Sequence, residues 1–165
     1  MHSIEPVLPI FLGLDGTTLS PQTFSSICVR CGWPEPVDDG IGLWEVAHAA
    51  NGTPLVLDTV TKPTTLICRL DSDDDYEPEN LLRGRVRERF DLNFEQSTTQ
   101  LTRLFPTRVA EGTYAPPFDW RFAHFQGLNS LIALEQTHYD PVMGVQLILL
   151  LQPARRVDGA VTSTW

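Results

Sequence analysis

The stretch Gly144–Gln152, GVQLILLLQ, contains the most apolar run in the chain. Gly144 and Pro153 bound this run, and its length is typical of a buried β-strand. The run is about half as long as a membrane-spanning helix must be, so we expect a core strand rather than a membrane span. Just upstream, the sequence YDPVMG (residues 139–144) is a turn signal. It predicts a C-terminal hairpin between this strand and residues 130–139, whose own pattern fits either a strand or a helix.

Two further apolar segments, PLVLDTV (residues 54–60) and TTLICRL (residues 64–70), also have the character of strands. They predict a hairpin whose turn lies around Lys62–Pro63. The alternating segment WRFAHFQ (residues 120–126) predicts another strand. Residues 7–14, VLPIFLGL, fit a short strand that is entered through proline.

The clearest helix is predicted by the sequence SPQTFSSICVRCG, residues 20–32. Ser20 is a typical N-cap, Pro21 suits the first helical position, and Gly32 suits the C-terminal end. Between these signals, apolar residues recur at helical spacing: Phe24, Ile27, Cys28 and Cys31. By contrast, residues 106–119 are rich in turn-forming residues and predict a loop.

These patterns predict an α+β fold, mainly an antiparallel β-sheet with a few short helices. The length of 165 residues suits one domain, and 42% apolar with 20% charged residues is a globular composition. We expect a single globular domain over residues 1–153 and a C-terminal tail over residues 154–165.

The formal net charge of −9 argues against binding to nucleic acid, because neutralising phosphates needs a basic surface. The same charge disfavours adhesion to an anionic membrane. Three cysteines cannot all pair within one chain, so reduced thiols are expected. We therefore expect an intracellular, cytoplasmic location or a place within an assembled particle.

The segment FLGLDGTTL (residues 11–19) resembles the first motif of haloacid-dehalogenase-type phosphatases, a strand that ends in Asp-x-Asp-Gly-Thr. Asp15, Gly16 and Thr17 match the second half of that motif. The segment also resembles the first phosphate loop of actin-like ATPases and sugar kinases, with one residue missing. Both resemblances imply phosphoryl chemistry at this loop.

The aspartate that attacks phosphorus in the phosphatase family is replaced here by Gly13, which has no side chain. We therefore favour a tight Asp-Gly turn after a strand. The alternative is a magnesium-dependent phosphoryl-handling enzyme. In that case Asp15 would share the metal with Asp73 and Asp75, which follow a predicted strand.

Cys28 and Cys31 form the pair CVRC, which is half of a typical zinc-binding pattern. Cys68 and His48 would complete a Cys₃His site, although the spacing matches no standard arrangement. Because the pair lies on the apolar face of the predicted helix, we favour a structural role in the core. A small zinc-stabilised binding domain remains the alternative.

Four arginines alternate along one segment: Arg83, Arg85, Arg87 and Arg89. A strand would place all four on one face, whereas a helix would stack Arg83 and Arg87 as like charges, so we expect a strand here. Such a face is suited to an anion or a carboxylate-bearing partner. We favour the simpler interpretation that the arginines pair with the acidic run just before them.

No intact catalytic motif emerges. Ser130, His124 and His138 are isolated polar candidates, and the sequence does not determine whether they converge. We therefore assign no catalytic residue and no cofactor, and favour a non-enzymatic interaction or assembly module. Such a module would be a subunit of a larger protein complex or viral-type particle, with protein partners that are copies of itself or other chains.

Overall fold

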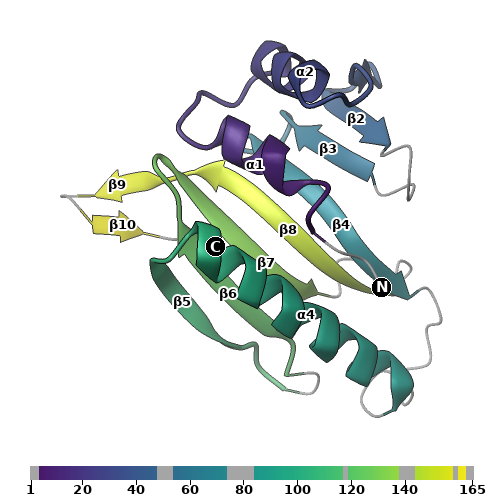
Figure 1. The fold of residues 1–165 in the computed structure, drawn as a ribbon, viewed down its shortest axis with the longest axis vertical. Helices are drawn as coiled ribbons and strands as arrows, with labels where there is room; N and C mark the ends of the chain where they lie inside the picture. The colour runs from purple at the N-terminus through teal and green to yellow at the C-terminus, as the bar shows by residue number, and fades with distance from the viewer. Residues whose placement is uncertain are drawn as a thin grey trace.

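The computed structural model is a single α+β domain built on one open, entirely antiparallel sheet of eight strands (Figure 1). It describes residues 4–47, 54–73, 84–116, 119–137, 144–157 and 160–162. The helices are α1 (Leu8–Leu14), α2 (Pro21–Arg30) and α4 (Arg85–Leu104). The sheet strands are β1 (Val37–Asp38), β2 (Leu43–Ala47), β3 (Pro54–Asp58), β4 (Thr65–Asp73), β5 (Arg108–Thr113), β6 (Arg121–Gln126), β7 (Ser130–Thr137) and β8 (Val145–Pro153). No helix in these ranges is long and apolar enough to cross a membrane.

The sheet consists of two four-stranded meanders, β1–β4 and β5–β8, each preceded along the chain by helix. Their last strands, β4 and β8, pair with each other and join the meanders at the centre of the sheet. The short strands β9 (Arg155–Val157) and β10 (Ala160–Thr162), within the predicted tail, pair separately from the sheet. The strand order leaves β1 and β5 at the two edges.

The predicted core strand is confirmed, and the strands of both predicted hairpins pair with each other, although residues 139–143 of the predicted turn YDPVMG lie outside the described residues. β8 is buried along most of its length. Every residue of β7 pairs with β8, so residues 130–137 form a strand. β3 and β4 pair antiparallel, with Leu55 opposite Cys68, and the Lys62–Pro63 peptide between them is cis. The apolar run of β8 therefore forms the middle of the sheet, where its side chains are buried on both faces.

The helices lie on one face of the sheet and enclose the main core (Figure 1). Because side chains alternate along a strand, Leu147, Leu149 and Leu151 of β8 face this core. Ile148 and Leu150 point to the opposite face, where they form a small second cluster. The two clusters explain why β8 is apolar at successive positions rather than at alternate ones.

The predicted helix over residues 20–31 is confirmed as α2. The Ser20 side chain caps it by accepting a hydrogen bond from the Thr23 N–H at 3.2 Å, and Pro21 occupies the first position. Gly32 follows the helix with φ +76°, a left-handed conformation that glycine adopts without strain. Phe24 and Cys28 are fully buried, so the predicted apolar face does pack inward.

Two predicted strands are wrong, because both segments form helices. Residues 8–14 form α1, with Pro9 in the first turn, where its missing N–H is not needed. The run is short and apolar, and such runs do not distinguish a helix from a strand by their period. The arginine segment lies at the start of α4, and its alternation is overridden by apolar residues at helical spacing further along, including Phe90, Phe94 and Leu101.

The loop predicted over residues 106–119 is also partly wrong, because residues 108–113 form strand β5. β5 pairs only with β6 in the described part of the chain, and most of its residues are exposed. An edge strand lacks the apolar alternation that marks a core strand, which explains why its pattern indicated a loop.

Candidate functional site

The segment that resembles a phosphate loop fastens the end of α1 to the β6–β7 turn. The two carboxylate oxygens of Asp15 accept hydrogen bonds from the Leu128 N–H, each at 2.9 Å, and Oδ1 also accepts one from Ser130 Oγ at 2.8 Å. A side chain at Gly127 would collide with this carboxylate, since a Cβ there would lie 2.4 Å from Oδ1. Asp15 therefore links the C-terminal end of α1 to the β6–β7 turn.

Gly13 lies where α1 and α2 approach closely. A Cβ at this position would stand 2.9 Å from Ile27 Cγ2, so the missing side chain leaves room for the neighbouring helix. This packing requirement explains the glycine at the position where the phosphatase motif has its attacking aspartate.

The structure does not bring Asp15 and Asp73 together. Ser130, the partner of Asp15, pairs with Pro153, whereas Asp73 pairs with Val145 at the other end of β8. Eight residues of strand separate the two ends, which is roughly 26 Å at about 3.3 Å per residue. Asp75, the third residue of the predicted magnesium site, lies outside the described residues.

The cysteines belong to the core or its margin. Cys28 and Cys68 are fully buried, and Cys31 packs partly buried against the same cluster. Burial raises the pKa of the Cys68 thiol to about 12, and burial together with the neighbouring Cys31 raises that of Cys28 to about 12. His48 lies outside the described residues, among which no group of three His, Cys, Asp or Glu side chains is arranged to hold a metal.

The arginine segment forms ion pairs near the first turns of α4. Arg89 contacts Asp71 at 3.1 Å and Asp73 at 3.0 Å, which confirms for this residue that the arginines pair with the acidic run. Asp71 also accepts a hydrogen bond from Asn93 Nδ2 at 2.7 Å. Arg87 contacts Asp91 at 2.9 Å. These contacts tie α4 to β4 and to its own next turn.

Of the other two arginines in this segment, Arg85 is the exposed first residue of α4, and Arg83 lies outside the described residues. The segment therefore does not form the single four-arginine face that a strand would have produced. Arg87 and Arg89 use their positive charge in ion pairs that hold the helix in place.

The isolated polar candidates do not converge. Ser130 points to the helix-covered face and binds Asp15, whereas His124 lies on the opposite face, where its Nε2 is 2.9 Å from Glu135 Oε1. Burial, with the charge and hydrogen bond of Glu135, raises the pKa of Tyr114 beside this pair. His138 lies outside the described residues.

A groove of about 600 Å³ lies between α4 and the edge of the sheet. We call it the α4–β5 groove. It is lined by Phe94, Glu95, Thr98, Thr99, Thr102 and Arg103 of α4, by Arg108, Glu111, Gly112 and Thr113 of β5, and by Arg121, Phe122 and Ala123 of β6. Because α4 packs on β6 and β7, the helix-side face of β5 is left uncovered.

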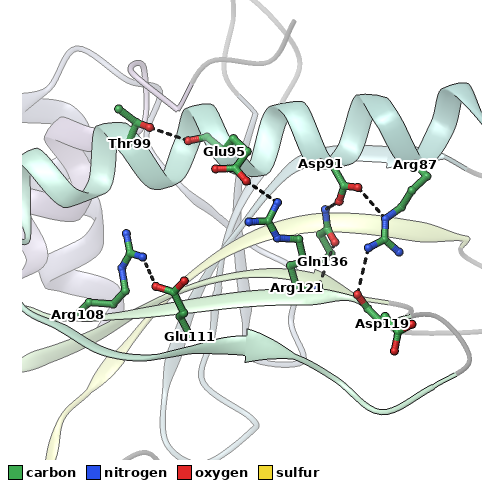
Figure 2. Close-up of polar contacts among 9 residues, drawn as sticks. All are labelled: Arg87, Asp91, Glu95, Thr99, Arg108, Glu111, Asp119, Arg121 and Gln136. Carbon is green, nitrogen blue, oxygen red and sulfur yellow. Dashed lines mark hydrogen bonds and ion pairs between the residues drawn. The ribbon is translucent and has the colours of Figure 1, made fainter.

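Two ion pairs cross or line the groove (Figure 2). Arg121 Nη1 lies 2.7 Å from Glu95 Oε1, and its guanidinium stacks 4.5 Å from the centre of the Phe94 ring. On β5, Arg108 pairs with Glu111 and also donates from Nη2 to Thr102 Oγ1 at 3.0 Å. The Glu95 side chain is 59% exposed, so its ion pair is open to solvent and is of low net strength.

Three threonines of α4 line the groove, and they differ in one respect. Thr99 Oγ1 donates to the Glu95 carbonyl at 2.9 Å, and Thr102 Oγ1 donates to the Thr98 carbonyl at 2.8 Å. Thr98 Oγ1 is buried and has no hydrogen-bond partner among the described residues. An unsatisfied buried hydroxyl costs about 1–3 kcal/mol.

Sequence reasoning missed the groove because its residues come from three elements that only the fold brings together. A usable signal was present in STTQLT, where Thr98 and Thr102 recur at the four-residue spacing of one helix face.

No protein-family model, curated protein or solved structure was found to match this chain.

Proposed function

We propose that the protein is a non-enzymatic interaction module, a subunit of a larger protein assembly, and that it holds a partner segment in the α4–β5 groove. The observation that carries this proposal is the groove itself, a cavity of about 600 Å³ lined by three arginines in a chain whose net charge is −9. Local positive charge on an acidic protein favours one orientation of a partner and rejects others.

The free edge of β5 supports a polypeptide partner. β5 borders the groove, and its outer edge has no strand beside it in the described part of the chain. Unpaired backbone groups along such an edge can accept an extended segment as an additional strand. The register shift at Val109 and the charged pair Arg108–Glu111 limit uncontrolled pairing of this edge with other sheets.

The chemistry of the groove supports binding rather than catalysis. Its described lining residues include no histidine and no cysteine, and the Thr98 hydroxyl has no hydrogen-bond partner among the described residues that could activate it. Solvent-exposed ion pairs such as Arg121–Glu95 cost little to open, so a partner can replace one side of the pair. Three free thiols support a reducing setting, inside the cell or within an assembled particle.

Site-directed photo-crosslinking in the native host tests the proposal. A benzophenone amino acid replaces Thr99, which is exposed in the groove, or Val29, which is 58% exposed on α2 and serves as the control position. We expect one defined protein adduct from position 99 and none from position 29. The same adducts from both positions, or none from position 99, would contradict the proposal.

A further inference from the structure

We propose that a pocket on the face of the sheet opposite the helices binds a small monocarboxylic acid with an apolar body, such as a medium-chain fatty acid. The pocket lies over β2, β3, β4 and β8, which are neighbours in the sheet, and has a volume of about 350 Å³ (Figure 1). We call it the far-face pocket. The inference is independent of the proposed function, because the α4–β5 groove lies on the helix side of the sheet, beside β5 and β6.

Apolar side chains form the floor of the far-face pocket. Val56 and Ile67 lie opposite each other on β3 and β4, with Leu43 on β2 and Ile148 on β8 to either side. Because side chains alternate along a strand, these residues point away from the helix-covered core, and Ile67 and Ile148 belong to the small second cluster. Ligand pockets usually have volumes of about 300–1,000 Å³, so this pocket suits a small molecule with an apolar body.

Arg69 supplies a positive charge at one end of this floor. It lies opposite Ile148 and is half-buried, and its guanidinium makes no ion pair, hydrogen bond or ring contact with any described residue. On the helix side, by contrast, the guanidinium groups of Arg89 and Arg121 are each paired with a carboxylate. A guanidinium does not lose its charge in proteins, and a partly buried charge is stabilised by an anion beside it.

Two acidic side chains on this face have other partners. Glu135, which lies opposite Ile148 on β7, is 2.9 Å from His124 Nε2. Asp58 lines the other end of the pocket, where it accepts hydrogen bonds from the N–H groups of Val60 and Thr61 at 2.8 and 3.0 Å. Arg69 is therefore available to an anion that enters the pocket.

Gln146 supplies a second polar group that a ligand can reach. The residue is only 5% exposed and lines the pocket, and its side-chain amide has no hydrogen-bond partner among the described residues. The amide is nevertheless not one of the buried polar atoms that are sealed from solvent, so it is open to the pocket. Gln146 lies opposite Ser72, at the next position on this face after the Arg69–Ile148 pair, so Arg69 and Gln146 are diagonal neighbours.

These two groups define the ligand. A guanidinium and an amide NH₂ donate hydrogen bonds and together carry one positive charge, which matches one carboxylate. Arg69 and Thr65 are four residues apart on β4, so the apolar floor between them is roughly 13 Å long at about 3.3 Å per residue. Asp58 lies opposite Thr65, and its negative charge would repel a second carboxylate at the far end of a ligand. The ligand is therefore a monocarboxylate whose chain lies over Val56 and Ile67.

A titration followed by two-dimensional NMR tests the inference with octanoate, and with octanol, octylamine and octanedioate as matched probes. With octanoate we expect saturable shifts of the Gln146 side-chain NH₂ and of the Val56 and Ile67 amides. Affinity should be at least about tenfold lower for each of the other three, because octanol lacks the charge, octylamine has the opposite charge and octanedioate meets Asp58. Equally tight binding of any of the three, or shifts confined to other parts of the molecule, would overturn the inference.

Matched variants assign the contact with the carboxylate. Arg69→Met keeps an unbranched side chain but removes the charge, so affinity for octanoate should fall at least about tenfold, while affinity for octanol stays within about twofold. Arg85→Met removes the same charge from the exposed start of α4 and should leave octanoate affinity within about twofold. Arg69→Lys keeps the charge but loses the planar fork, so its affinity should lie between those of Arg69→Met and the wild-type protein.

Urea unfolding checks that each variant is folded. Unchanged octanoate affinity in Arg69→Met, or equal losses in Arg69→Met and Arg85→Met, would refute the site. If Arg69→Met does not fold, Gln146→Met decides the question instead, because it removes the amide donor and keeps the charge. Its octanoate affinity should fall about threefold to tenfold, and an unchanged value would refute the site.

Discussion

The α1–α2 pair and helix α4 cover the same face of the sheet with different surfaces. The buried residues of α1 and α2 are all apolar or cysteine, namely Ile10, Phe11, Leu14, Phe24, Ile27 and Cys28. α4 buries polar residues among its aromatic ones, namely Asn93, Ser97 and Thr98. α4 is held by ion pairs to β4 and β6, and it leaves the helix-side face of β5 open.

The difference lies in the kind of side chain that each region buries. An apolar helix pair gains free energy from burial and packs closely enough to require a glycine at position 13. A helix with buried polar groups must find partners for them, and Thr98 has none within the described part of the chain. The α1–α2 pair therefore contributes apolar burial alone, whereas α4 buries both apolar and polar side chains.

The largest expected effect comes from truncating an aromatic side chain in the apolar helix pair. Phe24→Ala should lower the free energy of unfolding by about 3–5 kcal/mol, because it leaves a cavity under a fully buried residue. Arg121→Ala in the groove should cost less than about 1 kcal/mol, because its ion pair is exposed. Urea unfolding measures both, with Val29→Ala as the control on the outer face of α2. Similar losses of unfolding free energy from Phe24→Ala and Arg121→Ala would contradict the difference between the two regions.

A smaller effect is expected where the two regions meet. Asp15→Asn should lower the free energy of unfolding by about 2 kcal/mol, because the charged acceptor of the Leu128 N–H and the Ser130 hydroxyl is lost. A double-mutant cycle with Ser130→Ala should show coupling between the two residues. Additive losses would mean that this link between the regions has no energetic role. A generic magnesium phosphatase assay should give the same rate for Asp15→Asn and the wild-type protein.

The smallest expected effect is the loss of folding stability at alkaline pH that a buried thiol causes. The pKa of Cys68 is raised to about 12 in the folded protein, against about 8.5 in an unfolded chain. The unfolded chain therefore releases this proton from about pH 8.5 upward, while the folded protein retains it until about pH 12. The contribution of this thiol to stability is complete below pH 8.5 and should fall by about 1.4 kcal/mol per pH unit above it. Cys28, whose pKa is also raised to about 12, adds a similar fall of its own. Urea midpoints at pH 7 and pH 9.5 measure the total fall, which Cys68→Ala should make about half as steep, and an equally steep fall in that variant would exclude this cause.

The parts of the fold that sequence predicted correctly are those that local signals determine. Ser20, Pro21 and Gly32 mark the ends of α2, and the apolar run of β8 matches a strand buried on both faces. The predictions failed where local and tertiary preferences disagree. The alternating arginines at the start of α4 suggested a strand, but Phe94 and Leu101 further along pack as one helix face.

The sequence by itself determined a β-rich α+β domain, the inward-facing thiol of Cys28 and the absence of an attacking aspartate at position 13. These features depend on residue type and on spacing within a few turns of chain. Only the tertiary structure decided that Asp15 binds the β6–β7 turn and that Arg108 and Arg121 contact α4 at Thr102 and Glu95. Such contacts join residues far apart in the chain, and their geometry follows from how α4 packs on the sheet.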